Sequence, residues 1–141
     1  MSDCLFCKIV SGSIPSTKVY EDDHVVAFMD IMPLTKGHTL LIPKKHYANV
    51  YEMPSEEAGQ LFSVVPKIAS ALNTAFEPAG LNLINNNGAP AGQSVFHFHL
   101  HFIPRYDKTD GLKVNWQTKE KQYSSDLFNE YAEKIRTNIN N

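Results

Sequence analysis

The sequence predicts an α+β fold, a mostly antiparallel sheet of about five strands with one long helix and one C-terminal helix on one side. Short segments rich in β-branched and aromatic residues recur between turn signals. A long segment repeats apolar residues at helical spacing, and a second amphipathic segment closes the chain. The 141 residues, 43% of them hydrophobic, contain no repeat or linker. We therefore expect one domain over residues 1–141.

The first half of the chain is predicted to form one helical turn and three strands. Residues 5–10 favour a turn of helix that ends near Gly12. Residues 18–20 and 24–29 flank a turn-prone acidic stretch and predict a hairpin. Residues 38–42 are apolar and predict a buried strand.

The long helix is expected over residues 55–76. Ser55 is its predicted N-cap, and Pro66 is expected to kink it because proline removes one backbone donor. The predicted core stripe comprises Ala58, Leu61, Phe62, Val65, Ile68, Ala69, Leu72 and Phe76.

Two strands and a helix are expected in the second half. Residues 81–85 and 95–103 predict strands joined by a glycine-containing loop. The final helix begins at about Ser125, with an apolar face made of Leu127, Phe128, Tyr131 and Ile135.

The net charge limits the classes of ligand, and the N-terminal residues indicate the cellular location. The formal net charge of -2 comes from 13 basic and 15 acidic residues that form no long basic run, which argues against a nucleic-acid polymer as ligand. A small phosphorylated ligand remains compatible, because backbone amides and histidines can hold one phosphate. The chain shows no secretory signal and no apolar run long enough for a membrane span. We expect a cytoplasmic protein without membrane contact.

Histidine alternates with apolar residues in the last predicted strand. A strand has a side-chain period of two, so His97, His99 and His101 share one face, about 6–7 Å apart. The apolar residues between them enter the core. Two alternatives are a solvated histidine-rich face and a catalytic metal site.

The loop before these histidines favours phosphate as the ligand. Its glycines allow close backbone approach, while Asn86, Gln93 and Ser94 offer uncharged donors. Cys4 and Cys7 have a spacing that suits one tetrahedral ion, and the alternative is a pair of idle thiols.

The pattern His-φ-His-φ-His-φ-φ at residues 97–103, where φ is apolar, resembles the signature of the histidine triad (HIT) superfamily. The preceding Gly92-Gln93-Ser94 resembles its Hint branch. Similarity extends over residues 4–10, 14–15, 19–23, 27–31 and 37–46. This resemblance implies hydrolysis of nucleoside 5′-monophosphate conjugates, such as purine nucleoside phosphoramidates and adenylylated compounds, through a nucleotidyl-histidine intermediate.

The resemblance also assigns roles. His99 is the implied nucleophile, and His101 and His38 contact the phosphoryl group. Asp30 accepts from the ribose hydroxyls. Other implied nucleotide-binding residues are Asn86, Gly92, Gln93 and Ser94 at the phosphate, and Phe6, Ile9, Phe28 and Ile31 around the base.

By the same resemblance, Cys4, Cys7, His46 and His97 hold one structural zinc per chain. It further implies a homodimer that joins its sheets through the 55–76 helix and the strand from residue 81. The sequence leaves three other functions open: a nucleotide-binding regulatory or scaffold protein with incidental catalysis, a dinucleoside polyphosphate hydrolase, and a metalloenzyme with zinc at His97, His99 and His101.

Overall fold

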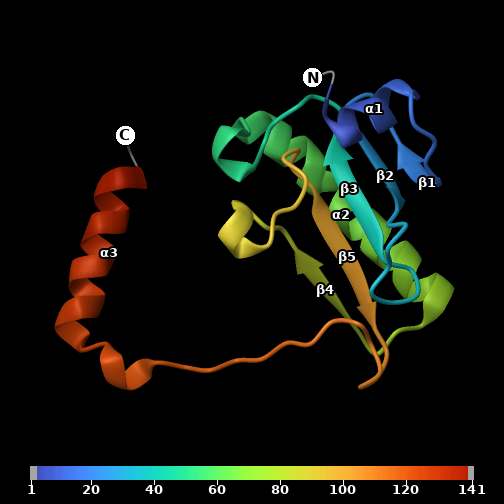
Figure 1. Cartoon of the computed structure of the whole chain (residues 1–141). Coiled ribbons are helices and arrows are strands. Elements are labelled where there is room, and N and C mark those ends of the chain that lie inside the picture. The colour runs from blue at the N-terminus through green and yellow to red at the C-terminus, as the bar shows by residue number, and fades with distance from the viewer. Residues whose placement is uncertain (1–2, 140–141) are drawn as a thin grey trace.

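The computed structural model describes residues 3–139 and contains a five-stranded antiparallel sheet (Figure 1). The strand order is β1-β2-β3-β5-β4, and every neighbouring pair is antiparallel. This confirms the predicted α+β class. The strands are β1 (Lys18–Glu21), β2 (Val25–Met29), β3 (Thr39–Pro43), β4 (Gly80–Ile84) and β5 (Leu100–Arg105), and the helices are α1 (Leu5–Ser11), α2 (Ser55–Phe76) and α3 (Ser125–Ile139).

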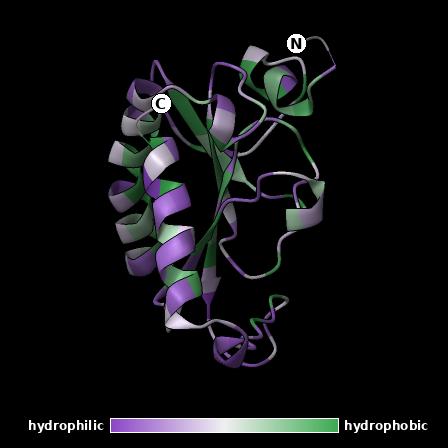
Figure 2. Cartoon of the chain, turned by 90° about the vertical axis from the view of Figure 1, so that its left-hand side faces the viewer, coloured by the Kyte–Doolittle hydropathy of each residue, from purple (hydrophilic) through white to green (hydrophobic). Residues whose placement is uncertain are grey.

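Each face of the sheet has its own hydrophobic core. Along β2, Val25 and Ala27 pack with residues of α2, whereas Val26 and Phe28 pack with residues of α1. Helices α1 and α2 therefore cover opposite faces of the sheet, and the sequence did not predict a helix on the α1 face. Figure 2 shows the sheet nearly edge-on. Helix α1 lies on one face, near the top of the view, and α2 runs along the opposite face. The two-residue period of a strand produces this division.

The N-cap of helix α2 lies one residue earlier than predicted. Pro54 has the extended N-cap conformation and Ser55 is the first helical residue, so the expected Ser55 cap is wrong. The helix continues through Pro66. Phe62, predicted in the core, is 47% exposed, whereas Val64 is buried. At 100° per residue, Val64 lies closer than Phe62 to the middle of a stripe made of Leu61, Val65, Ile68 and Leu72.

Strand β5 begins at Leu100, so the predicted strand over residues 95–103 is wrong at its start. Before that point the backbone leaves the ladder, and the N–H of Phe98 donates to the carbonyl of Tyr47 (2.6 Å). The alternation nevertheless persists, because Phe98 and Phe102 both enter the α2-side core. His97 is thus carried by the irregular segment that precedes β5.

Helix α3 stands apart from the sheet (Figure 1), at the end of a long extended segment. None of its described residues is buried, and Phe128 and Ile135 are more than half exposed. Among residues 3–139, no helix combines the length and the apolar character that crossing a bilayer requires.

Candidate active site and metal centre

A cavity of about 200 Å³ opens on the α1 face of the sheet. Helix α1, the end of β2 and the strand β5 with its approach contribute its walls. Of the predicted site residues, eight line it: Phe6, Ile9, Phe28, Asp30, Ile31, Ser94, His99 and His101. The apolar members Phe6, Ile9 and Phe28 are buried beneath it, while Ile31 is 90% exposed at its rim.

His99 carries its proton on the nitrogen that faces the backbone. Its Nδ1 lies 2.7 Å from the carbonyl oxygen of His97. A carbonyl only accepts, so Nδ1–H is the donor and Nε2 keeps a free lone pair. Burial lowers the pKa of His99, which favours this neutral form. A neutral imidazole with a bare Nε2 beside a cavity can act as a nucleophile.

His38 and His101 form a hydrogen-bonded pair with a defined proton order. The backbone N–H of Leu34 donates to Nδ1 of His38 (3.1 Å). His38 Nε2 lies 2.9 Å from His101 Nδ1, so the proton between them belongs to His38. Burial lowers the pKa of His101 to about 4, which keeps that ring neutral. His101 is left with a proton on Nε2, ready to donate to a ligand.

Asp30 lies beside this pair. Its Oδ1 accepts from the backbone N–H of Met32 (2.8 Å), and its Oδ2 lies 3.5 Å from Nε2 of His38. The carboxylate is therefore fixed at the cavity wall with acceptor capacity remaining. This position suits the predicted contact with ribose hydroxyls.

The loop at residues 86–94 holds itself together through Gln93. The side-chain Oε1 of Gln93 accepts from Gly88, and its Nε2 donates to the carbonyls of Ala48 (2.6 Å) and Val95 (3.1 Å). The buried Gln93 amide is thus hydrogen-bonded within the loop and does not line the cavity, and its phosphate contact stays a prediction. Asn86 and Gly92 likewise lie off the cavity, and Ser94 alone of these loop residues lines it.

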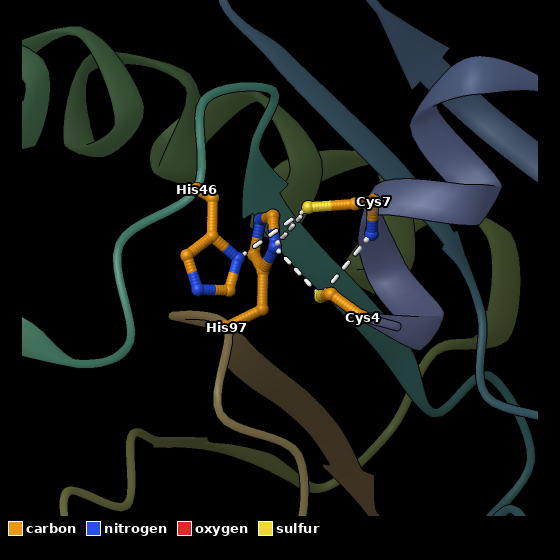
Figure 3. A group of neighbouring side chains, drawn as sticks. All are labelled: Cys4, Cys7, His46 and His97. Atoms are coloured by element: carbon orange, nitrogen blue, oxygen red, sulfur yellow. Dashed lines mark hydrogen bonds between the residues drawn. The ribbon is translucent and has the colours of Figure 1, made fainter. Parts of the chain in front are cut away.

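A second cluster brings together Cys4, Cys7, His46 and His97 (Figure 3). Their four ligand atoms lie within 4.8 Å of one another. Sγ of Cys4 is 3.4 Å from Nδ1 of His97, and Sγ of Cys7 is 3.4 Å from Nδ1 of His46. Bond lengths of about 2.3 Å to sulfur and about 2.05 Å to nitrogen give a tetrahedral S···N edge of about 3.6 Å. The donor set therefore fits a zinc ion in both chemistry and spacing.

The protonation states in this cluster also suit a cation. Nε2 of His97 lies 2.8 Å from the carbonyl of Pro43, so Nε2–H donates there and Nδ1 is free toward the sulfurs. Burial raises the pKa of the Cys7 thiol, with the adjacent Cys4 adding to the effect. A cation in the cluster would offset both effects by stabilising the thiolate.

The three triad imidazoles do not converge on one point. Within residues 3–139, His97 belongs to the cysteine cluster, whereas His101 groups with Asp30 and His38. His99 belongs to neither group. The geometry thus disfavours the alternative of a single zinc held by His97, His99 and His101.

Comparison with known families decides the relationship. Residues 11–108 match the model of the HIT domain. The chain belongs to the HIT family. This HIT chain is 59% identical over 128 residues to the protein Hit of Bacillus subtilis, covering 90% of this chain and 88% of that protein. It is 42% identical over 113 residues to an adenosine 5′-monophosphoramidase of Schizosaccharomyces pombe, covering 80% and 82%.

Solved structures agree with the HIT fold. A HIT family protein from Bacillus anthracis superposes with a TM-score of 0.95 at 50% identity, covering 97% of both chains. A zinc-bound histidine triad family protein from Mycobacterium smegmatis superposes with a TM-score of 0.73 at 34% identity, covering 96% of this chain and 97% of that one. The predicted family membership is confirmed.

Sequence reasoning missed the backbone groups that orient the imidazoles in this HIT domain. The Leu34 amide and the Pro43 carbonyl each bind a histidine, yet any residue type supplies such groups, so no side-chain signal marks them. Ile14 and Pro15, which also line the cavity, lay within the stretches that resemble the family but received no role.

Proposed function

We propose that this chain hydrolyses nucleoside 5′-monophosphate conjugates, with purine nucleoside phosphoramidates and adenylylated compounds as the substrate class. The observation that carries the proposal is the bare Nε2 of His99, at a cavity with apolar walls on one side and the His101 Nε2–H on the other. The Schizosaccharomyces pombe relative named as an adenosine 5′-monophosphoramidase supports it.

The reaction would proceed in two displacements on phosphorus. In the first, Nε2 of His99 forms a bond to the α-phosphorus and the P–N bond to the leaving amine breaks, the amine taking up a proton from solvent. The His97 carbonyl accepts from Nδ1–H throughout and stabilises the imidazolium form. In the second, water attacks the phosphorus, the P–Nε2 bond breaks, and the proton of the attacking water passes to solvent, which returns His99 to its neutral state. The Nε2–H of His101 stabilises charge on a phosphoryl oxygen in both steps.

The rest of the nucleotide would lie along the cavity. Phe6, Ile9 and Phe28 offer an apolar surface for the base, and the exposed Ile31 would lose contact with water when a base covers it. Asp30 would accept from the ribose hydroxyls. Ser94, the exposed loop residue at the cavity, would contact the phosphate or the leaving group.

The test is turnover of a fluorogenic adenosine phosphoramidate by the purified protein. Release of AMP supports the proposal. Tight AMP binding without turnover would instead favour a nucleotide-binding regulatory or scaffold protein. Preferential cleavage of a dinucleoside polyphosphate would favour a dinucleoside polyphosphate hydrolase. A crystal soaked with AMP would locate the base and the phosphate directly.

We also propose that Cys4, Cys7, His46 and His97 hold one structural zinc. Four protein ligands leave no open position for water, so the ion would stabilise the fold and take no part in the reaction. The zinc-bound Mycobacterium smegmatis relative supports this assignment. The proposed location is the cytosol, since a reducing compartment would keep Cys4 and Cys7 available as zinc ligands.

The predicted homodimer remains a proposal with support from three surfaces. β4 is an edge strand of the sheet and exposes Leu83, α2 exposes Phe62, and α3 exposes an apolar face away from the sheet. An isolated helix of this length is marginal in water, so α3 would gain stability from a partner surface. Light scattering should give twice the chain mass of 15.9 kDa. Ser63→Glu on the outer side of α2 should shift the mass toward the monomer, because a two-fold interface meets the charge twice.

A further inference from the structure

The turn at residues 106–111 packs against the loop that leads to His38. The N–H of Gly111 donates to the carbonyl of Leu34 (2.9 Å). Two residues further along the loop, the hydroxyl of Tyr106 donates to the carbonyl of Lys36 (2.7 Å). Two hydrogen bonds from one turn thus fix the backbone on both sides of residue 35.

An ion pair holds the turn closed. Oδ2 of Asp110 accepts from Nε of Arg105 (3.1 Å) and from the backbone N–H of Tyr106 (2.8 Å). The same guanidinium donates to Oδ1 of Asn82 on β4 and to the carbonyl of Leu112. Asp110 is buried, and these donors lower its pKa, the Tyr106 amide first. The turn is therefore anchored to the sheet.

The contact between the turn and the loop leaves no room for a side chain on Gly111. A Cβ placed there would lie 2.7 Å from the carbonyl oxygen of Leu34 and 3.2 Å from its Cα. Both are backbone atoms, so the loop itself would have to move. Gly80, at the start of β4, is the matched contrast because a Cβ there meets nothing within 4 Å.

Leu34 is also the residue whose N–H donates to Nδ1 of His38. Its amide therefore determines which ring nitrogens of the pair carry protons. His38 Nδ1 accepts from the Leu34 N–H, so Nε2 of His38 carries the proton and donates it to Nδ1 of His101. Asp30 faces the same His38 nitrogen at 3.5 Å and favours the same order. If the Leu34 amide moved, His38 could take its proton on Nδ1, and the order could reverse.

We propose that the 106–111 turn, through Gly111 and Tyr106, is a positioning element that holds the Leu34 amide and thereby keeps a proton on Nε2 of His101. The inference rests on the proposed function, since a phosphoryl oxygen needs that donor. In the reversed order His101 would present a lone pair to the phosphate and repel it. Arg105 and Asp110 act one step further back, by closing the turn.

The experiment measures the imidazole protons separately from turnover. Nitrogen-15 spectra of histidine-labelled protein distinguish protonated from bare ring nitrogens. We expect wild type and Gly80→Ala to show bare Nδ1 and protonated Nε2 on both His38 and His101. Gly111→Ala should show a mixed or reversed pattern on both rings. Its kcat for the phosphoramidate should fall roughly 10- to 100-fold, the scale of a small misplacement of reacting groups. Its KM should change by less than about threefold, because the base pocket is untouched.

Unchanged spectra in a folded Gly111→Ala protein would overturn the proposal, whatever its kcat, and so would a protonated Nδ1 on His38 in wild type. Tyr106→Phe removes one hydroxyl and serves if Gly111→Ala does not fold. In Tyr106→Phe, a smaller shift of the ring-nitrogen signals in the same direction supports the proposal. Unchanged ring-nitrogen signals in that variant would overturn it. If wild type shows no turnover at all, the proposed function fails, and the spectra still decide the role of the turn.

Discussion

His97 and His99 are two residues apart, equally buried, and chemically opposite. His97 donates from Nε2 to the Pro43 carbonyl and leaves Nδ1 bare toward two sulfurs. His99 donates from Nδ1 to the His97 carbonyl and leaves Nε2 bare at the cavity. In each case one backbone oxygen selects which ring nitrogen keeps its lone pair. The difference teaches that the role of a buried histidine depends on the carbonyl it meets as much as on the side chains around it.

The largest expected effect is the loss of turnover when His99, at the cavity, is replaced. His99→Ala should lower phosphoramidate turnover at least about 1,000-fold, because no other described side chain at the cavity offers a comparable nucleophile. AMP binding, measured by calorimetry, should persist. His24→Ala, on the exposed side of the β1–β2 turn, is the control. A loss smaller than about tenfold, or about 1.4 kcal/mol of barrier, would contradict the assignment of His99.

At the cysteine cluster that contains His97, substitutions should change stability more than turnover. Purified protein should hold one zinc per chain by elemental analysis, and Cys4→Ser or Cys7→Ser should lower that content. We expect the Tm to fall by about 5–10 °C, on the order of 2–3 kcal/mol for a chain of this size. The kcat should change by less than about threefold when measured below the lowered Tm. Chelated protein that loses turnover at an unchanged Tm would instead indicate a catalytic metal.

A third prediction concerns acid stability and His101. Burial lowers the pKa of His101 from 6.5 to about 4. Between these values the unfolded chain binds a proton that the folded chain does not, so the free energy of unfolding falls as the pH falls through this window. The contribution is complete above about pH 6.5. His101→Gln should flatten the dependence by up to about 1.4 kcal/mol per pH unit, measured by urea unfolding at several pH values. Equal slopes in both proteins would show that His101 titrates normally.

The smallest expected effect is at the rim of the cavity. Ile31→Ala should raise the KM by about two- to fivefold, the equivalent of about 1 kcal/mol of apolar contact with a base. Its Tm should stay within about 1 °C of wild type, because the side chain is 90% exposed. A lowered kcat at an unchanged KM would place Ile31 outside the base pocket.

Much of the fold followed from residue patterns, because helical and strand periods report burial directly. The bounds of α2, the start of α3 and the hairpin of β1 and β2 are as predicted, to within about one residue. Residues 97–99 alternate between the two faces of the sheet as predicted, but they are not part of the strand. Period alone cannot show whether a backbone N–H reaches a neighbouring strand or, as at Phe98, a loop carbonyl.

The candidate site was less predictable wherever backbone groups or distant loops decide it. Family resemblance named the residues that the structure brings together around the cavity and at the cysteine cluster. It did not show that the Gln93 side-chain amide is hydrogen-bonded to backbone groups. Its three partners, Gly88, Ala48 and Val95, come together around it only in the folded chain. Nor could residue types show that the turn carrying Gly111 lies against Leu34, since only a missing Cβ marks that contact.

Residue 97 serves both centres at once, its imidazole in the cysteine cluster and its carbonyl under His99. The two centres are therefore coupled through this one residue. Replacing Cys4, Cys7 and His46 with an apolar plug would leave two other anchors near that peptide, the Phe98 N–H on the Tyr47 carbonyl and the His97 Nε2–H on the Pro43 carbonyl. A replacement of His97 itself would remove the second anchor together with a ligand of the cluster. An engineer can therefore change the other three ligands without removing either anchor, but a change at residue 97 alters the metal centre and the support of the nucleophile together.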